Sequence, residues 1–546
     1  MATTIEDIKR VLWAGADTFR GVIDAANYKD YVLTMLFIKF LDDTFEEWVD
    51  ELKAKYPDKP DRVARAIPRL PFQLADNIRY TYLYDKRYDS DIGATINQAL
   101  QGIEDLNGEL RGIFRGIDFN AESVFGNQQQ KTTKLRLLLE DFYELNLRPS
   151  EIVVPDGQTA AEVIGDAYEY MIGEFAAQAG QKAGAFFTPP MVSELMGRLT
   201  APQNDETIYD PTCGSASLLL RAAKQADLKK VGIYGQEING SAYAMARMNL
   251  FIHNVPDAQI KWGDTLANPL HLDADGNLKQ FDVIVANMPF SLDKWAEGFN
   301  PGGESDGEKD KKGKDKKFKM EASHDRFHRF EMGVPPASKG EWAFLLHMLA
   351  SLKNFGRMAA VVPHGVLFRG ASEGRIRQTV IDNNLLDAVI GLPENLFFGT
   401  SIKACILIFK KNRNTDNVLF IDASEKDAQG NLRYTKGKNQ NLLEEKHIRA
   451  IFDAYTKRED VEKFAHVASL EEIRANDYNL NIPRYVDTFE AEELIDIDEV
   501  QGNIKRIKTE LAVVEAQMEK YLKAYTPRKP ESKDTHAPQC SSQHCL

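Results

Sequence analysis

The chain has 546 residues, 43% of them hydrophobic and 27% charged, which is enough for two or three globular domains with cores of their own. Its net charge of −14 argues against a protein that wraps nucleic acid unaided, because non-specific affinity for DNA comes mainly from Lys and Arg. The four cysteines suggest no disulfide framework, and the N-terminus lacks the apolar core of a signal peptide. The best early apolar run, residues 31–41, is too short to span a bilayer, so we expect a cytoplasmic protein.

Residues 1–150 have a helical pattern. Val11, Leu12, Ala16 and Phe19 recur at three- and four-residue steps, and residues 31–48 continue in the same way. We therefore predict a helical N-terminal domain that ends near residue 150, where proline and glycine interrupt the chain. An aromatic and basic cluster in this region could contact phosphates or bases, although a solvated helix surface is the commoner explanation for each member. The cluster comprises Arg79, Tyr80, Tyr82, Tyr84, Lys86 and Arg87.

A proline-rich loop opens the next predicted domain, which spans residues 151–485. The apolar spacing of residues 159–178 predicts a helix, and the loop after it reads Phe186-Phe187-Thr188-Pro189-Pro190. Because this loop cannot lie inside a helix, we predict that Thr188 caps a new helix that begins at Pro189. A structural loop is the default interpretation, and a lid over a cofactor is the more specific one.

Strand-like runs alternate with helical segments after this loop, and the pattern fades beyond residue 411. Such alternation predicts an α/β fold with a parallel, doubly wound sheet, in which ligands bind beyond the carboxyl ends of the strands. The predicted strands are residues 208–209, 231–234, 260–262, 281–286, 358–362, 388–392 and 405–409.

Acidic residues stand at or just after the ends of the first three predicted strands. Asp210 opens a turn over residues 210–217 whose small side chains let backbone N–H groups approach a ligand. With an acid in front and one glycine, this turn suits a cationic ligand better than a pyrophosphate. Glu237 stands where an acid can bond both hydroxyls of a ribose, and Asp264 could meet an adenine amine. Each acid alone is more often a cap or turn residue, but three at consecutive strand ends indicate one site.

The fourth predicted strand organises the site. Residues 281–286 form an apolar run typical of a strand buried on both faces, and Asn287, Pro289 and Phe290 follow it. Asn287 could accept a hydrogen bond from an exocyclic amine, a loop carbonyl could accept a second, and Phe290 could stack on the ring. Taken alone, the stretch would favour an ordinary Asn-Pro turn.

Three further segments have distinct compositions. Residues 300–320 are rich in Gly, Asp and Lys, which predicts a mobile loop whose lysines could lie near a phosphate backbone. Residues 486–526 carry a coiled-coil seam that predicts a partner-binding helix, and residues 527–546 are predicted to be a disordered tail. The Cys and His residues of that tail lack a fourth zinc ligand, so we expect no metal site. The seam consists of Ile504, Ile507, Leu511, Val514, Met518, Tyr521 and Tyr525.

These motifs resemble those of the gamma-class amino methyltransferases of DNA, and most closely those of the modification subunits of type I restriction-modification systems. The resemblance covers nearly the whole chain and depends on the order of three motifs, which begin at Phe186, Asp210 and Asn287. It implies a Rossmann-like, doubly wound, seven-stranded methyltransferase sheet. It also implies N6-methylation of adenine in double-stranded DNA, with S-adenosylmethionine as the methyl donor.

The resemblance also implies partners. In that family a separate specificity subunit recognises the DNA sequence, which would explain why this chain is acidic and has no obvious base-reading domain. We expect the C-terminal helix to bind that subunit. A second copy of the chain and a restriction nuclease subunit are further candidate partners.

By position, the resemblance implies a catalytic clamp and a donor site. Asn287 and the carbonyl of Met288 would hold the amine of a flipped adenine, Pro289 would stiffen the loop, and Phe290 would stack on the base. Met288 stands where the family often has Pro, and Ala216 stands where it often has a second Gly. The donor-binding residues would be Phe186, Thr188, Asp210, Thr212, Gly214, Ser215, Glu237 and Asp264.

Two other kinds of function stay open on the sequence. An Asn-Pro clamp could also serve a methyltransferase that acts on a protein glutamine or an RNA base. The same fold could be the scaffold of a non-catalytic assembly subunit. A nicotinamide dehydrogenase is disfavoured, because the turn after the first strand lacks the G-x-G-x-x-G pattern.

Overall fold

The computed structural model describes residues 2–20, 23–179, 187–300, 318–398, 401–427, 429–438, 440–488 and 497–525. The chain divides into two compact units, Met1–Thr488 and Phe489–Leu546. Phe186, most of the predicted Lys-rich loop and the predicted tail lie outside the described residues, so what was expected of them stays a prediction. In the part that is described, no helix combines the length and the apolar character needed to cross a membrane.

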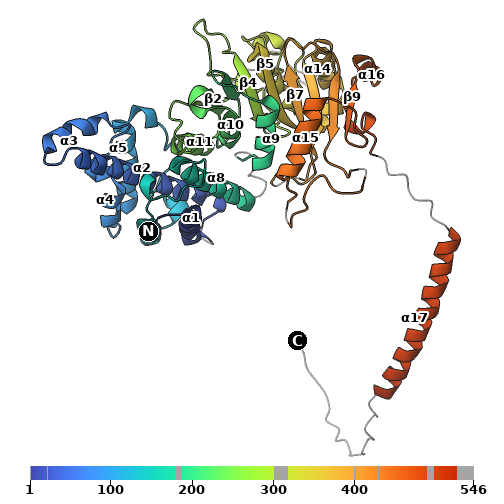
Figure 1. The fold of residues 1–546 in the computed structure, drawn as a ribbon, viewed down its shortest axis with the longest axis horizontal. Coiled ribbons are helices and arrows are strands. Elements are labelled where there is room, and N and C mark those ends of the chain that lie inside the picture. The colour runs from blue at the N-terminus through green and yellow to red at the C-terminus, as the bar shows by residue number, and fades with distance from the viewer. Residues whose placement is uncertain are drawn as a thin grey trace, which may run out of the picture. The chain divides into compact units, whose positions relative to one another are not determined.

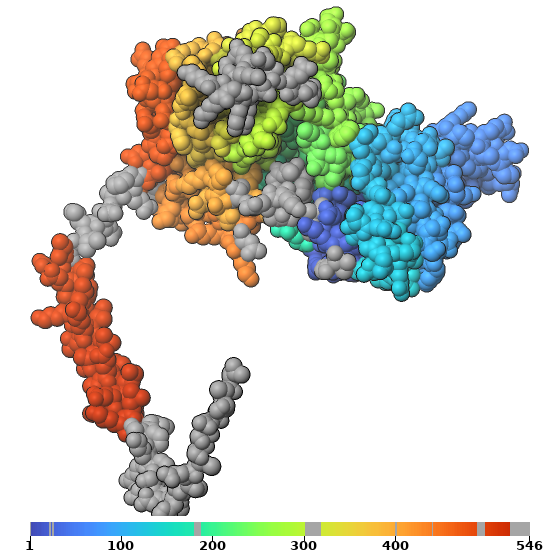
Figure 2. Space-filling model, turned by 180° about the vertical axis from the view of Figure 1, so that it is seen from behind, coloured from blue at the N-terminus to red at the C-terminus, as the bar shows by residue number. Residues whose placement is uncertain are grey.

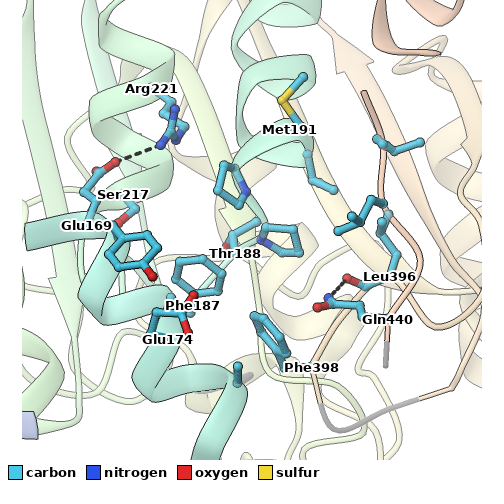
Figure 3. Close-up of a pocket in the computed structure, with 18 of the residues that line it drawn as sticks. Glu169, Glu174, Phe187, Thr188, Met191, Ser217, Arg221, Leu396, Phe398 and Gln440 are labelled. Carbon is cyan, nitrogen blue, oxygen red and sulfur yellow. Dashed lines mark hydrogen bonds and ion pairs between the residues drawn. The ribbon is translucent and has the colours of Figure 1, made fainter. Parts of the chain in front are cut away.

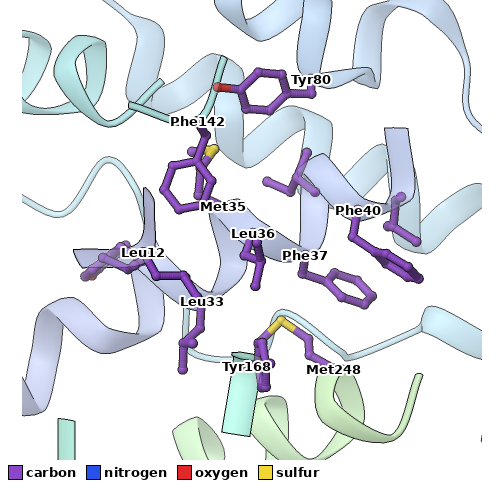
Figure 4. Packing of buried hydrophobic residues seen from close by; sticks show 14 of the residues in the cluster. Leu12, Leu33, Met35, Leu36, Phe37, Phe40, Tyr80, Phe142, Tyr168 and Met248 are labelled. Carbon is purple, nitrogen blue, oxygen red and sulfur yellow. The ribbon is translucent and has the colours of Figure 1, made fainter. Parts of the chain in front are cut away.

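The first unit begins with helices that pack around one apolar core, as predicted (Figures 1 and 4). Helix α8 (Ala160–Ala179), which follows the predicted boundary near residue 150, supplies Tyr168 to this core. Helix α11 (Gly240–Ile252) supplies Met248 (Figure 4), so the helical region and the sheet region share buried surface. Figure 2 shows the outer surfaces of these two regions lying against each other. The N-terminal helices are α1 (Ile5–Phe19), α2 (Ala25–Lys55), α3 (Pro60–Ala66), α4 (Tyr80–Asp85), α5 (Ile92–Leu106), α6 (Glu122–Phe125) and α7 (Gln128–Tyr143).

Nine strands of the described chain form one sheet in the order β3-β2-β1-β4-β5-β7-β6-β8-β9. Neighbouring strands run parallel, except that β7 is antiparallel to β5 and β6 and β9 is antiparallel to β8. The strands are β1 (Thr207–Asp210), β2 (Gly232–Glu237), β3 (Gln259–Trp262), β4 (Phe281–Asn287), β5 (Leu352–Pro363), β6 (Leu386–Gly391), β7 (Ala404–Lys410), β8 (Val418–Asp422) and β9 (Ala465–Ala468).

Helices cover both faces of this sheet, which accounts for the apolar character of its strands. In β4, Val283 and Val285 belong to one buried cluster, whereas Ile284 and Ala286 belong to the cluster on the opposite face. One face packs against α11 together with α9 (Pro190–Thr200), α10 (Ser217–Ala223) and α15 (Glu445–Lys457). The other packs against α12 (Glu341–Ala350), α13 (Gly365–Phe368), α14 (Ala371–Asp382) and α16 (Leu470–Ala475).

The predicted fold class is confirmed, and two details of the sheet differ from the prediction. Strands β8 and β9 extend the predicted seven strands to nine within the described chain. The antiparallel β7 also interrupts what was predicted to be a parallel sheet. The two added strands lie beyond residue 411, where polar loops separate short apolar runs and hide the alternation on which the prediction depended.

The second unit contains helix α17 (Ile497–Tyr525), which agrees with the predicted C-terminal helix. The side chains of the predicted seam from Ile504 to Tyr521 are between 48% and 70% exposed. Such a continuous apolar stripe is typical of a helix that packs against another helix.

Candidate active site

The residues predicted for the site follow four neighbouring parallel strands, β3, β2, β1 and β4. Asp210 ends β1, Glu237 ends β2, and Asn287 ends β4, while Asp264 lies two residues beyond β3. Because the carboxyl ends of parallel strands share one edge of a sheet, all four side chains come to the same edge. The structure therefore brings the three acids and Asn287 to one edge of the sheet.

The turn after β1 is held by the two buried acids. Asp210 Oδ1 accepts a 2.8 Å hydrogen bond from the Thr212 backbone N–H. Glu237 Oε2 accepts a 2.9 Å bond from the N–H of Gly214, and its Oε1 accepts a 2.7 Å bond from the N–H of Asn239. Gly214 and Ala216 have φ values of 54° and 63°, so the chain turns sharply into α10. Only glycine adopts this left-handed conformation without strain, which accounts for the glycine that the family often has at the second position.

The electrostatics of the turn favour a cationic ligand. Asp210 is 1% exposed and Glu237 is 5% exposed, and neither forms an ion pair with any described residue. Burial, with a smaller contribution from the nearby Glu237, raises the pKa of Asp210 to about 8, against the hydrogen bonds from Thr212. Burial also raises the pKa of Glu237, although its backbone hydrogen bonds oppose the rise. Two buried carboxyl groups without a cationic partner fit a ligand that brings positive charge.

Asn287 and Thr188 meet at the rim of the pocket that this turn forms. Asn287 Nδ2 donates a 3.1 Å hydrogen bond to Thr188 Oγ1, across 99 positions of sequence. The predicted capping role of Thr188 is wrong, because α9 begins at Pro190 and its N-cap is Pro189. The second proline takes the first helical position and leaves the Thr188 hydroxyl for Asn287. The pocket is lined by Phe187, Thr188, Asp210, Thr212, Cys213, Gly214, Ser215, Ser217, Leu218 and Asn287.

Other predicted site residues lie outside this pocket. Asp264 is half-buried, and its Oδ1 accepts hydrogen bonds from the N–H groups of Leu266 and Ala267. The Met288 side chain is buried, whereas Pro289 and Phe290 are half-buried. The Phe290 ring packs edge-on against that of Phe397, with 5.9 Å between the ring centroids.

A larger hollow lies beside the pocket and shares Phe187, Thr188 and Ser217 with it (Figure 3). On one side, Arg221 forms a 3.0 Å ion pair with the buried Glu169 of α8. On the other side, Gln440 donates a hydrogen bond to the carbonyl of Leu396. Neither Asp210 nor Asn287 lines this hollow, whereas both line the smaller pocket.

The sequence did not point to three aromatic and apolar side chains at this edge. Phe397 and Phe398 follow β6, and Phe398 packs against Phe187 with 5.7 Å between ring centroids. Ile238, directly after Glu237, is 63% exposed, and its carbonyl accepts a hydrogen bond from the indole of Trp262. Each comes just after the carboxyl end of a predicted strand, and that position could have identified them.

The aromatic and basic cluster near residue 80 is engaged within the protein. Arg79 forms a 2.5 Å ion pair with Asp42, and the hydroxyl of the buried Tyr80 donates to the carbonyl of Leu139. Arg87 lies 3.8 Å from the centre of the Tyr84 ring. These contacts favour a structural role over the phosphate contacts that the sequence also allowed.

Comparison with known proteins identifies the family. The pattern of the N-6 DNA Methylase family matches residues 159–494, and that of the HsdM N-terminal domain matches residues 8–142. The chain belongs to the N-6 DNA methylase family. Its predicted enzyme class is thereby confirmed as an adenine-specific DNA methyltransferase that uses S-adenosylmethionine. A cationic donor suits the two buried acids that hold the turn after β1, Asp210 and Glu237.

Curated relatives and a solved structure place this N-6 DNA methylase among type I methylase subunits. It is 32% identical over 538 residues to the type I restriction enzyme MpnII methylase subunit of Mycoplasma pneumoniae, covering 92% of this chain and 93% of that protein. It is 29% identical over 511 residues to the type I restriction enzyme MjaVIII methylase subunit of Methanocaldococcus jannaschii, covering 92% of this chain and 81% of that protein. The type I restriction-modification methyltransferase subunit of Streptococcus thermophilus has 35% identity and a TM-score of 0.73, covering 89% of this chain and 100% of that one.

Proposed function

We propose that Asn287, the backbone carbonyl of Met288 and Phe290 hold the extruded target adenine, beside a pocket that takes the methionine end of the donor. The observation that carries the proposal is the hydrogen bond from Asn287 Nδ2 to Thr188. It engages the amide nitrogen and leaves Oδ1 as an acceptor to which no described residue donates. An acceptor at this place, next to the Asp210 turn, matches what an exocyclic amine requires.

The clamp would act by presenting the amine lone pair. An aryl amine is a weak nucleophile because its lone pair is delocalised into the ring. Asn287 Oδ1 and the Met288 carbonyl, each accepting one amine hydrogen, would favour the pyramidal form with an available lone pair. When bound, S-adenosylmethionine supplies a methyl group activated by its sulfonium. Extruding the base costs a few kcal/mol, and stacking on Phe290 would return about 1–3 kcal/mol.

The acids would hold the rest of the donor. Asp210, with Thr212, Gly214 and Ser215 of the same turn, would face its charged methionine end. Glu237 would accept from the ribose hydroxyls with lone pairs that its backbone partners leave available. Asp264 would accept from the adenine amine through Oδ2, since its Oδ1 is engaged. Ile238 would cover one face of the adenine, because it directly follows Glu237 and its apolar side chain is 63% exposed.

For partners, we propose that α17 pairs with helices of a separate specificity subunit, which selects the double-stranded DNA site. The exposed apolar stripe of α17 supports this role, and so does the net charge of −14, which leaves DNA affinity to another subunit. A second copy of the chain and a nuclease subunit would complete a larger assembly. The DNA substrate favours the cytoplasm as the site of action.

Asn287→Ala in the complex with the specificity subunit tests the clamp. We expect methyl transfer to DNA to fall about 100-fold or more, because the amine loses its positioning acceptor. Donor binding by calorimetry should stay within about twofold, because the donor's main contacts lie elsewhere in the pocket. Asn383→Ala, at an exposed residue after α14, is the matched control and should behave as the unmodified protein. Near-normal transfer by Asn287→Ala would contradict the proposal.

A further inference from the structure

We infer that Glu341, the first residue of α12, is a positioning residue for methyl transfer, because it fixes the loop that carries Met288 and Phe290. The inference builds on the proposed clamp and adds to it the group that sets the clamp's geometry. Glu341 contacts neither base nor donor in this account. It acts through the backbone of Ser291, the residue that follows Phe290.

The loop after Phe290 has a backbone that needs support. Ser291 has a φ of 55° and Lys294 has a φ of 57°, in the left-handed region that side chains other than glycine's disfavour. Such residues persist only where the surrounding structure holds them. Ser291 is exposed, so its conformation is not imposed by packing of its own side chain.

The segment before α12 supplies that support through hydrogen bonds. The N–H of Lys294 donates to the carbonyl of Ala337 over 2.8 Å, and the N–H of Gly340 donates to the carbonyl of Leu292 over 2.9 Å. The N–H of Ser291 itself donates to Glu341 Oε1 over 3.1 Å. Lys339 Nζ donates to the Ser291 hydroxyl over 2.8 Å. Glu341 is thus the side chain that holds the backbone N–H of the strained residue next to Phe290, whereas Lys339 contacts only its exposed hydroxyl.

Glu341 is placed unusually for the first residue of a helix. Acidic side chains at that position are commonly solvated and interact only with the positive end of the helix dipole, whereas Glu341 is 0% exposed. Its Oε1 lies 3.5 Å from Arg369, which also forms a bidentate pair with the buried Glu373. Its Oε2 has no hydrogen-bond partner among the described residues. Burying a carboxyl group with an oxygen that has no partner costs free energy. We therefore attribute the buried position of Glu341 to its hydrogen bond with the loop after Phe290.

Two substitutions of similar size separate this role from ordinary helix stabilisation. Glu341→Met removes the acceptor, whereas Glu341→Gln keeps one. In the complex with the specificity subunit and target DNA, we expect Glu341→Met to lower kcat for methyl transfer tenfold or more, with donor affinity within about twofold. We expect Glu341→Gln to retain at least about half of the rate. Glu445→Met is the control, because Glu445 also begins a helix and pairs with an arginine, Arg198.

Changes at Ser291 provide two further tests, and the Ser291→Pro test holds even if Glu341→Met does not fold. Ser291→Gly adopts a positive φ without strain, so adding it to Glu341→Met should restore the rate at least threefold. Ser291→Pro removes the N–H donor and imposes a negative φ, so it should lower kcat at least tenfold by itself. Normal kcat in Ser291→Pro or in Glu341→Met would overturn the inference.

Parallel measurement of Asn287→Ala distinguishes the two proposals. If Asn287→Ala loses transfer while Glu341→Met and Ser291→Pro retain it, only the inference about Glu341 fails. If Asn287→Ala retains transfer, the clamp itself fails, and the role of Glu341 fails with it.

Discussion

The buried Asp210 leads to a pH dependence of donor binding that can be worked out from the structure. Its raised pKa of about 8 means that, without donor, the carboxyl is about 1% ionised at pH 6 and about 9% ionised at pH 7. A cationic donor binds the ionised form, so its association constant should rise about ninefold between these two pH values.

Isothermal titration calorimetry of the protein with S-adenosylmethionine at pH 6 and pH 7 measures this effect. Higher pH is avoided because the donor's own α-amino group titrates near pH 8. Asp210→Asn should bind the donor at least about tenfold more weakly at pH 7 and should lose most of the pH dependence. An affinity of the unmodified protein that is flat between pH 6 and pH 7 would refute the reasoning.

The raised pKa of Asp210 also makes the free energy of unfolding fall as the pH rises. A carboxyl whose folded pKa is raised from 3.8 to about 8 stabilises the fold fully below pH 4, and this contribution is lost as the pH rises towards 8. The full shift corresponds to at most about 6 kcal/mol. Asp210→Asn should therefore raise the melting temperature of the donor-free protein at pH 8. A fall in that melting temperature would show that the carboxyl is stabilised by an unrecognised partner.

Three further predictions concern single contacts. Thr188→Val removes the acceptor for Asn287 and should lower kcat about fivefold, which corresponds to about 1 kcal/mol. The melting temperature should stay normal, and an unchanged kcat would contradict the role of this contact. Ala216→Gly relieves a left-handed backbone, and calorimetry should show a higher melting temperature, for a gain of up to about 1 kcal/mol; a lower one would contradict the strain. Leu511→Glu, on the exposed stripe of α17, should abolish co-elution with the specificity subunit on gel filtration and leave donor binding intact; continued co-elution would place that partner elsewhere.

The sequence was sufficient to predict those features of the fold that depend on the residues of one short segment. The apolar run of β4 predicted a strand buried on both faces, and the residues of β4 alternate between the two buried clusters. Asp210, Glu237 and Asn287 could be placed together because the ends of parallel strands meet at one edge. For the same reason, the pocket could be anticipated without knowing any contact.

The remaining features depend on contacts between residues far apart in the sequence. Thr188 looked like a helix cap because its neighbours favoured one, and only the fold brings Asn287 to its hydroxyl. Arg79 looked available for phosphate, but Asp42 of α2, 37 positions earlier in the chain, engages it. Strand β9 has the sequence Ala-His-Val-Ala, which is too short to predict a strand without its neighbour β8.

A crystal structure of the complex with a donor analogue and target DNA tests the central claim most directly. The account predicts an extruded adenine whose amine donates to Asn287 Oδ1 and to the Met288 carbonyl, with the Phe290 ring against its face. The amine nitrogen that accepts the methyl group should lie next to the turn that begins at Asp210. An adenine bound away from Asn287, or Phe290 still packed on Phe397 with no base beside it, would contradict the account.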